Sequence, residues 1–193
     1  MVDSNPSSLI PGRGGASLVL IRTNEDSHTL LLSYGASRET NFDDFWFVNV
    51  DRKSYAVTKA RRINMKELDN FTTRNSMASA AIKDKVVFFG GQDSEKGINY
   101  NDLFVLDIPT LTVRQHQYPE GKIAPEPRNS HTLSQSTGEG SDIAYLFGGA
   151  NEHGPRKDLY KLDLKSLEFS NVKLSESAKA LLPSLEMHTA HVY

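Results

Sequence analysis

The sequence predicts an all-β protein assembled from about three copies of one small, four-stranded antiparallel sheet. The first observation behind this prediction is a repeated phrase, in which an Asp precedes a short apolar run and a turn. The phrase occurs at residues 43–55, 101–113 and 157–169, and its leading Asp residues are 58 and 56 positions apart. Recurrence at such a period is typical of repeat architectures, in which each copy forms one supersecondary unit.

Two further landmarks recur upstream of that phrase, always in the same order. An aromatic residue followed by small residues reads SYGA, FFGG and LFGG, beginning at Ser33, Phe88 and Leu146. An Arg landmark reads RNSM from Arg74 and RNSH from Arg128, with a weaker version, RGGA, from Arg13. A last version, LEMH, lacks the Arg but keeps His188 at the position that His131 holds in the third unit. Three ordered landmarks at a common spacing indicate tandem repeats.

Each unit is expected to contain four short strands. The first strand follows the Arg landmark, the second ends at the glycines, and the third begins at the repeated Asp. The fourth is expected to end eleven residues beyond that Asp, at Tyr55, Val113 and Phe169. Short segments rich in Val, Ile, Leu, Phe and Tyr between turn residues are typical of strands. Several are continuously apolar, which predicts that both faces of the sheets are covered.

The first unit departs from the other two at two positions. With Gly35, Gly90 and Gly148 aligned as the first glycine of each unit, Ala36 replaces the second glycine and Asn49 the second Asp. Between the units, residues 64–70 and 175–182 are rich in good helix formers, and Ser175 could cap the latter segment before Pro183 ends it. These two segments could therefore form short helical inserts.

Tandem units with Gly-Gly after an aromatic strand, then Asp-Leu-Tyr-x-Leu-Asp and a late aromatic, resemble kelch repeats. In that family each repeat forms one four-stranded blade of a β-propeller. The resemblance implies a partial propeller with blades at about 11–57, 74–115 and 128–171, a partial blade at 183–193 and a flexible N-terminus at 1–10. The family usually has Trp at the late aromatic position, whereas Tyr55, Val113 and Phe169 stand there in this chain.

A kelch propeller closes with about six or seven blades, so three blades and the start of a fourth leave the ring open. An open arc would expose an apolar blade face at each end, and such patches drive association. Three explanations follow: the chain is a fragment of a longer protein, an unusual gene product, or half of a ring closed by another chain. Further blades, from the missing part of the chain or from another chain, are therefore expected partners.

Composition argues against several classes of partner. The 193 residues carry a formal net charge of −2 and include no Cys. This near-neutral charge gives no support for a nucleic-acid partner or for an anionic membrane surface. No run approaches the roughly 18 apolar residues that cross a bilayer. The first residues lack the pattern of a secretory signal, so a cytoplasmic location is expected, with the nucleus as the alternative.

No group of residues forms a convincing catalytic or metal-binding motif. His188 and His191 are three apart, a spacing that points their side chains to opposite faces of a strand. Without Cys, thiolate metal sites and cysteine nucleophiles are excluded. Kelch-type copper oxidases use a Cys, and the iron-binding pattern associated with the plant specifier proteins is not found either, so neither activity is implied. We expect no catalytic residue, no metal and no cofactor.

The resemblance implies instead a non-enzymatic scaffold or adaptor that recognises a protein or peptide partner. Kelch propellers use the loops after the glycines, and those around the Arg landmark, as a recognition face. Carried over to this sequence, the candidates after the glycines are Ser37, Arg38, Gln92, Asp93, Asn151, Glu152 and His153. Those around the Arg landmark are Asn75, Ser76, Asn129 and Ser130. The alternatives are that the segment belongs to a kelch-propeller enzyme, or docks substrates for an associated one.

Overall fold

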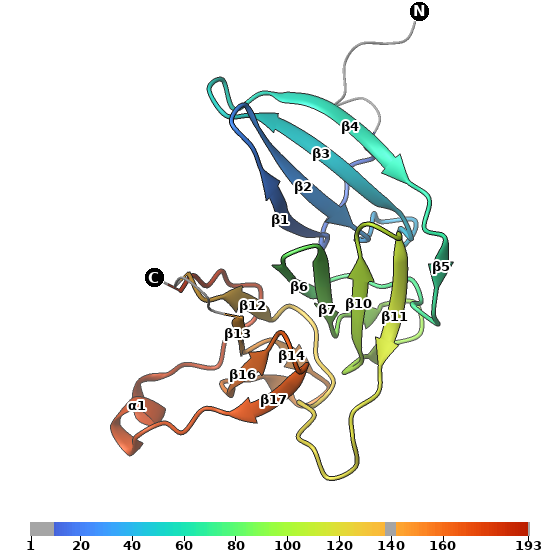
Figure 1. Ribbon diagram of the computed structural model, residues 1–193. Coiled ribbons are helices and arrows are strands. Elements are labelled where there is room, and N and C mark those ends of the chain that lie inside the picture. The colour runs from blue at the N-terminus through green and yellow to red at the C-terminus, as the bar shows by residue number, and fades with distance from the viewer. Residues whose placement is uncertain (1–9, 138–141, 193) are drawn as a thin grey trace, which may run out of the picture.

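The computed structural model describes residues 10–137 and 142–192, and nearly all of its regular structure is β (Figure 1). Three sheets, each with four antiparallel strands and the second with one further strand described below, follow one another along the chain, and we call them blades 1, 2 and 3. The strands of blade 1 are β1 (Ser17–Thr23), β2 (Ser27–Ser33), β3 (Phe45–Asp51) and β4 (Val57–Ile63). Those of blade 2 are β6 (Ala78–Ile82), β7 (Lys85–Phe89), β10 (Leu103–Asp107) and β11 (Thr112–His116). Those of blade 3 are β12 (Thr132–Gln135), β13 (Ile143–Phe147), β16 (Leu159–Asp163) and β17 (Glu168–Asn171).

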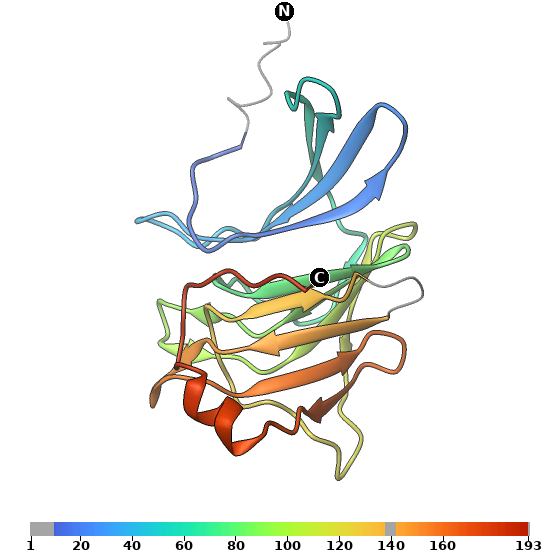
Figure 2. The ribbon, with the colours of Figure 1, turned by 90° about the vertical axis from the view of Figure 1, so that its left-hand side faces the viewer.

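The blades stack face to face, and their innermost strands β1, β6 and β12 lie side by side (Figure 2). One apolar cluster fills the space between blades 1 and 2, and a second fills the space between blades 2 and 3. Strand β7 supplies both, because Val86 and Phe88 belong to the first cluster and Val87 and Phe89 to the second. The prediction that continuously apolar strands have both faces covered is therefore confirmed for the middle blade.

Backbone hydrogen bonds also join the blades around their common axis. The amide of Ser76 donates to the carbonyl of Gly15 at 2.7 Å, Ser130 donates to Ser76 at 2.8 Å, and Met187 donates to Ser130 at 3.0 Å. All four residues have positive φ, between 53° and 61°, so they hold equivalent positions in successive units. The segment after Pro183 therefore docks as the beginning of a fourth unit, and Ser134 donates a further hydrogen bond to the carbonyl of Ala190 at 2.7 Å.

The fourth strands were expected to end at Tyr55, Val113 and Phe169, but they begin near these residues. Tyr55, Leu111 and Leu167 occupy the same left-handed turn position, with φ of 56°, 56° and 60°. Val57 is thus the counterpart of Val113, and Tyr55 is 77 % exposed instead of packing between blades. The cause is a third strand, β3, that is two residues longer than β10 or β16. Strand β4 accordingly runs to Ile63, past residue 57, where the first blade was expected to end.

The same added length corrects the prediction for the second Asp. Asp51, and not Asn49, accepts backbone hydrogen bonds from the turn after β3, at 3.0 Å from Lys53 and 2.7 Å from Ser54. Asp163 accepts the equivalent bonds in blade 3. Asp and the residues after it form such turns because a short carboxylate reaches the amides two and three positions ahead. The first unit therefore keeps its second Asp.

The glycine alignment is also shifted by one position in blade 1. Gly35 has the φ of Gly91 and Gly149 (96°, 93° and 87°), whereas Tyr34 has the φ of Gly90 and Gly148 (58°, 65° and 63°). Tyr34 therefore replaces the first glycine, and Ala36 does not replace the second. The strained backbone of Tyr34 is held by burial, by stacking on Phe71 and by a 2.9 Å hydrogen bond from its hydroxyl to the Phe71 carbonyl.

One of the two helical inserts is confirmed and the other is wrong. Helix α1 (Glu176–Leu181) lies within residues 175–182, and the Ser175 hydroxyl caps it by accepting from the amide of Ala178 at 3.2 Å. Residues 64–70 instead contain β5 (Glu67–Leu68), which pairs in parallel with the outer edge of β11. The edge of β11 offers this segment backbone partners as a strand. The expected flexible N-terminus, 1–10, lies almost wholly outside the described residues.

Candidate functional site

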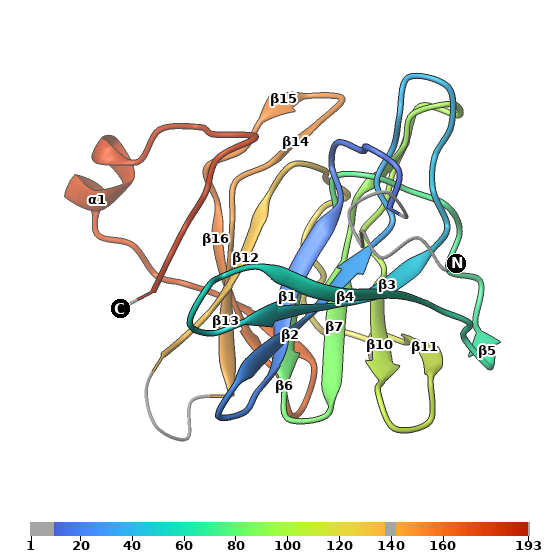
Figure 3. The same cartoon turned by 90° about the horizontal axis from the view of Figure 1, so that it is seen from above.

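The loops between the second and third strands of all three blades emerge on one side of the protein, at the left in Figure 2. They comprise residues 34–44, 90–102 and 148–158, and we call this side, together with the Arg landmark segments beside it, the loop face. Two of the loops contain small hairpins, β8 (Gln92–Asp93) with β9 (Ile98–Asn99), and β14 (Ala150–Asn151) with β15 (Gly154–Pro155). Figure 3 shows the β14–β15 hairpin along the same edge as the loop of blade 1.

An ion pair underlies each loop and joins the buried Arg side chain of the Arg landmark to the repeated Asp. The pairs are Arg13 with Asp44, Arg74 with Asp102, and Arg128 with Asp158. In blade 3 the guanidinium donates to both carboxylate oxygens, at 2.6 and 2.8 Å, and to the carbonyl of Gly148 at 2.9 Å. The sequence showed both landmarks but gave no sign that they pair. Their function is to fix the two ends of each loop.

The charge of Arg128 also controls the ionisation of Asp158. Burial by itself would raise the pKa of this carboxyl, but the hydrogen bonds and positive charge of Arg128 outweigh burial and lower the pKa. The pKa of Asp44 is lowered in the same way, against burial, by hydrogen bonds from Arg13 and Trp46. Both carboxylates therefore stay ionised and paired at neutral pH.

His131 packs between blades 2 and 3, directly beneath the loop face. Its ring lies edge-on to Phe89, with centroids 5.4 Å apart, and a Cβ added to Gly90 would lie 2.9 Å from its Cε1. Burial, aided by the positive charge of Arg128, lowers the pKa of His131 to about 3. This environment is that of a packing residue. In blade 2 the equivalent residue is Met77, which is buried in the same apolar cluster as Tyr34.

We expect a His131→Met variant to lose part of the acid sensitivity of the wild type. A neutral, buried His that ionises readily only when unfolded gives stability that is present above pH 6.5 and is lost as the pH falls toward 3. One such group contributes a slope of up to about 1.4 kcal/mol per pH unit. Urea unfolding between pH 7 and about 4 measures this slope.

The comparison has an internal control. Both proteins should still lose stability below about pH 4, where the unfolded-state carboxyls of Asp44 and Asp158 bind protons that the paired groups resist. Equal slopes above pH 4 in the variant and the wild type would contradict the assignment.

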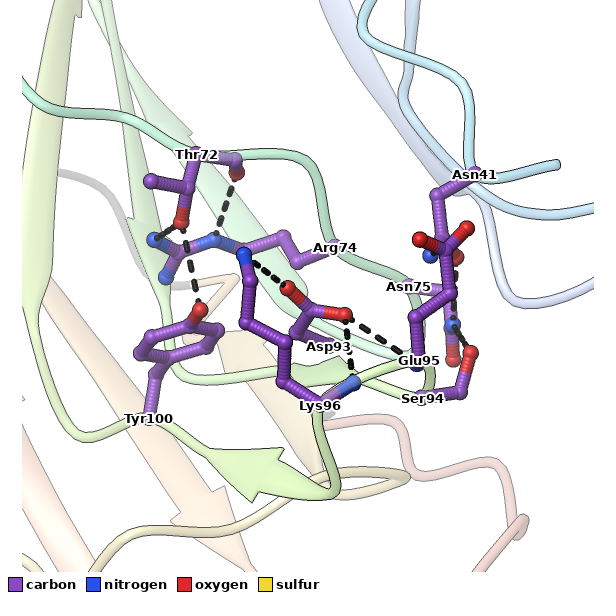
Figure 4. Close-up of polar contacts among 9 residues, drawn as sticks. All are labelled: Asn41, Thr72, Arg74, Asn75, Asp93, Ser94, Glu95, Lys96 and Tyr100. Atoms are coloured by element: carbon purple, nitrogen blue, oxygen red, sulfur yellow. Dashed lines mark hydrogen bonds and ion pairs between the residues drawn. The ribbon is translucent and has the colours of Figure 1, made fainter.

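Three of the candidate binding residues are buried and act within the scaffold. Asn75 donates to the side chain of Asn41 at 3.0 Å, and Asn129 donates to that of Asn99 at 2.7 Å, so each links its blade to the loop of the preceding one. Asp93 is 2 % exposed, and its Oδ1 accepts from the amides of Glu95 and Lys96 at 3.1 and 3.2 Å (Figure 4). These side chains position the loops and leave little surface for a partner.

The other candidates are accessible to different degrees. Arg38, Glu152 and His153 are exposed, and so is Ser37, whose hydroxyl accepts from the amides of Glu39 and Thr40 at 3.1 Å. Gln92 and Asn151 are half-buried. Ser76 and Ser130 are half-buried as well and line a depression of about 350 Å³ at the axis, together with Met187 and His188.

Sequence reasoning missed further exposed charges on this face, namely Glu95, Lys96 and Glu126. The sequence feature that could have indicated them was their position in the longest loops. Among the described residues no three His, Asp or Glu side chains gather as a metal site would require. In the same part of the chain, none of the helices has the length and apolar character to cross a membrane.

Four-stranded antiparallel sheets stacked around an axis, with their first strands innermost, define the blades of a β-propeller. A family model described as the KLHDC2/KLHL20/DRC7 kelch-repeats domain matches residues 4–193. The chain belongs to the kelch-repeat family, and the resemblance drawn from its landmarks is confirmed.

Two curated relatives share part of the sequence. Acyl-CoA-binding domain-containing protein 4 and acyl-CoA-binding domain-containing protein 5, both of Arabidopsis thaliana, are 29 % identical to this chain over 98 residues. The similar stretch covers 51 % of this chain and 14 % of each relative. The chain therefore corresponds to a small part of those proteins.

Proposed function

We propose that this chain is a non-enzymatic interaction module that binds a protein or peptide partner through its loop face. Kelch-repeat domains generally act as protein–protein interaction modules. The observation that carries the proposal is that buried and exposed polar side chains on this face have different roles. Buried polar groups such as Arg128, Asn129 and Asp93 fix the loops, whereas the loop tips carry exposed polar side chains.

Recognition by such a face depends on shape and hydrogen bonding, without any bond being made or broken. The exposed tips differ from blade to blade, with Arg38 in blade 1, Glu95 in blade 2 and His153 in blade 3. Varied side chains on a rigid scaffold are typical of binding loops, since the scaffold spares the complex the entropy of ordering them. A partner that spans three blades would contact both signs of charge.

The proposal predicts that an Arg38→Ala/Glu95→Ala/His153→Ala variant loses its partner while its unfolding free energy stays within about 0.5 kcal/mol per site of the wild type. A matched control removes a cation, an anion and a neutral polar residue from turns on the opposite side: Lys53→Ala/Asp84→Ala/Ser166→Ala. Quantitative affinity capture with the three proteins measures the effect. Proteins that are captured less by the loop-face variant than by the wild type and the control are the expected partners. Equal recovery by all three proteins would contradict the role of this face in binding.

One observation favours a second candidate, a docking part of a larger protein. The relatives in which the similar stretch covers 14 % are named for an acyl-CoA-binding domain, so kelch-like repeats accompany another domain there. In that case the loop face would recruit a target to a neighbouring domain. Elemental analysis distinguishes both of these binding functions from an enzymatic one. A stoichiometric transition metal in the purified chain would favour an enzyme.

A further inference from the structure

The outer edges of blades 2 and 3 are covered by the segment of chain that enters each blade. In blade 2, the amides of Lys66 and Asp69 donate to the carbonyls of Leu111 and Val113 at 2.8 and 3.1 Å, so β5 pairs along the edge of β11. In blade 3, Ile123 forms an antiparallel bridge with Phe169 of β17. An uncovered edge strand exposes unpaired amides and carbonyls, and each segment pairs with some of them.

Charge pairs accompany both covers. Arg114 of β11 binds two carboxylates of the covering segment, those of Glu67 and Asp69, the latter at 3.2 Å. In blade 3 the direction is reversed, because Lys122 of the covering segment lies 3.0 Å from Glu168 of β17. Each cover thus combines backbone pairing with an opposite charge on the outermost strand.

Blade 1 differs, because no described residue pairs with the outer edge of β4. Counted from the start of the third strand, Arg61 holds the position in blade 1 that Arg114 holds in blade 2. Arg61 lies opposite Phe47, the third residue of β3, and Arg114 lies opposite Val105, the third residue of β10. Neither Arg61 nor Lys59 forms an ion pair with a described residue, and the Arg61 guanidinium lies 5.6 Å from the Phe47 ring. The blade therefore offers a seven-residue edge with two unused cations.

We infer that the β4 edge is a second docking site, which takes an extended acidic segment of a partner protein as a fifth strand of blade 1. Backbone hydrogen bonds along an edge provide the affinity in this mode of recognition, and alternate side chains provide the specificity. Carboxylates of the segment would pair with Arg61 and Lys59, as Glu67 and Asp69 pair with Arg114. Residues 1–9 contain a single carboxylate, Asp3, so the acidic occupant is assigned to a partner.

This site is separate from the loop face, and it does not depend on the function proposed for those loops. The probe is a fluorescent peptide of alternating Thr and Glu, about nine residues long. Fluorescence anisotropy with the full chain should show saturable binding that weakens steeply at about 0.5 M salt. Hydrogen exchange should show new protection of the β4 amides and no change in the loops at 90–102.

Two variants and one modified peptide make the test specific. A Lys59→Glu/Arg61→Glu variant should weaken binding by at least about tenfold, whereas Lys53→Glu/Lys85→Glu, with the same change of net charge, should leave it unchanged. A peptide N-methylated on all of its amides should not bind to either protein, because it cannot pair as a strand through either of its edges. Binding that survives N-methylation would overturn the inference in favour of simple charge attraction. Absence of binding to the wild type would overturn it too, since cations on an edge can serve merely to prevent pairing.

Discussion

An Arg128→Met variant is expected to lose about 3–5 kcal/mol of unfolding free energy. The guanidinium is fully buried, so its removal leaves the Asp158 carboxylate and the Gly148 carbonyl without their donors. Met fills much of the space but donates no hydrogen bond. Because Arg128 also holds the pKa of Asp158 down, acidification removes this pair's stabilisation from the wild type but relieves the unpaired carboxylate of the variant, so the difference between the two proteins should shrink as the pH falls. Denaturant unfolding at pH 7 and pH 5 measures both effects.

Arg114→Met provides the control, because it removes the same group from the surface. Arg114 and its partners Glu67 and Asp69 are exposed, and exposed pairs are worth less than about 1 kcal/mol. A loss as small at Arg128 as at Arg114 would show that the landmark pairs contribute little to the stability of the blades.

The second large effect is expected for Gly149→Ala, with a loss of about 2–4 kcal/mol. Gly149 has a φ of 87°, and a Cβ there would lie 2.6 Å from the carbonyl oxygen of Asn129 and 2.7 Å from the Cβ of His131. Both atoms belong to the strand-leading segment of the same blade, so neither can retreat without disturbing β12. Thermal unfolding measures the loss.

Gly154→Ala in the same blade separates the cost of backbone strain from the cost of close atomic contacts. Gly154 has a similar φ, 94°, but no atom lies within 4 Å of the position of its added Cβ. This control should lose only the cost of a left-handed backbone, about 1–2 kcal/mol. If the two variants were equally destabilised, close packing would not be the reason for the glycine.

The fold was predictable because repetition made weak signals additive. One short apolar segment cannot be assigned with certainty, but three in the same order can, and the blades follow the predicted strand order. The predictions were wrong where the repeat alignment, which contained no gaps, crossed a difference in strand length between blades. Two extra residues in β3 displaced Tyr55 and Asn49 from their assigned positions, and Tyr34 concealed a glycine site because a buried aromatic contact offsets its backbone strain.

The candidate site was predictable in place but not in detail. The loops that sequence reasoning selected do share one face. Which of their polar residues are exposed depends on hydrogen bonds across blades, such as that from Asn75 to Asn41, and no spacing within one repeat reveals such contacts. Residues 64–70 show the same limit, since the partner that makes Glu67 a strand residue lies about 45 positions away in β11.

Three backbone hydrogen bonds around the axis run in one direction: each amide belongs to the later unit and each carbonyl to the earlier one. Gly15 accepts from Ser76, Ser76 from Ser130, and Ser130 from Met187. A ribosome therefore releases every acceptor before its donor has been synthesised, and each new blade emerges onto a template that is already finished. For these three bonds, growth of the arc can proceed in the order of translation.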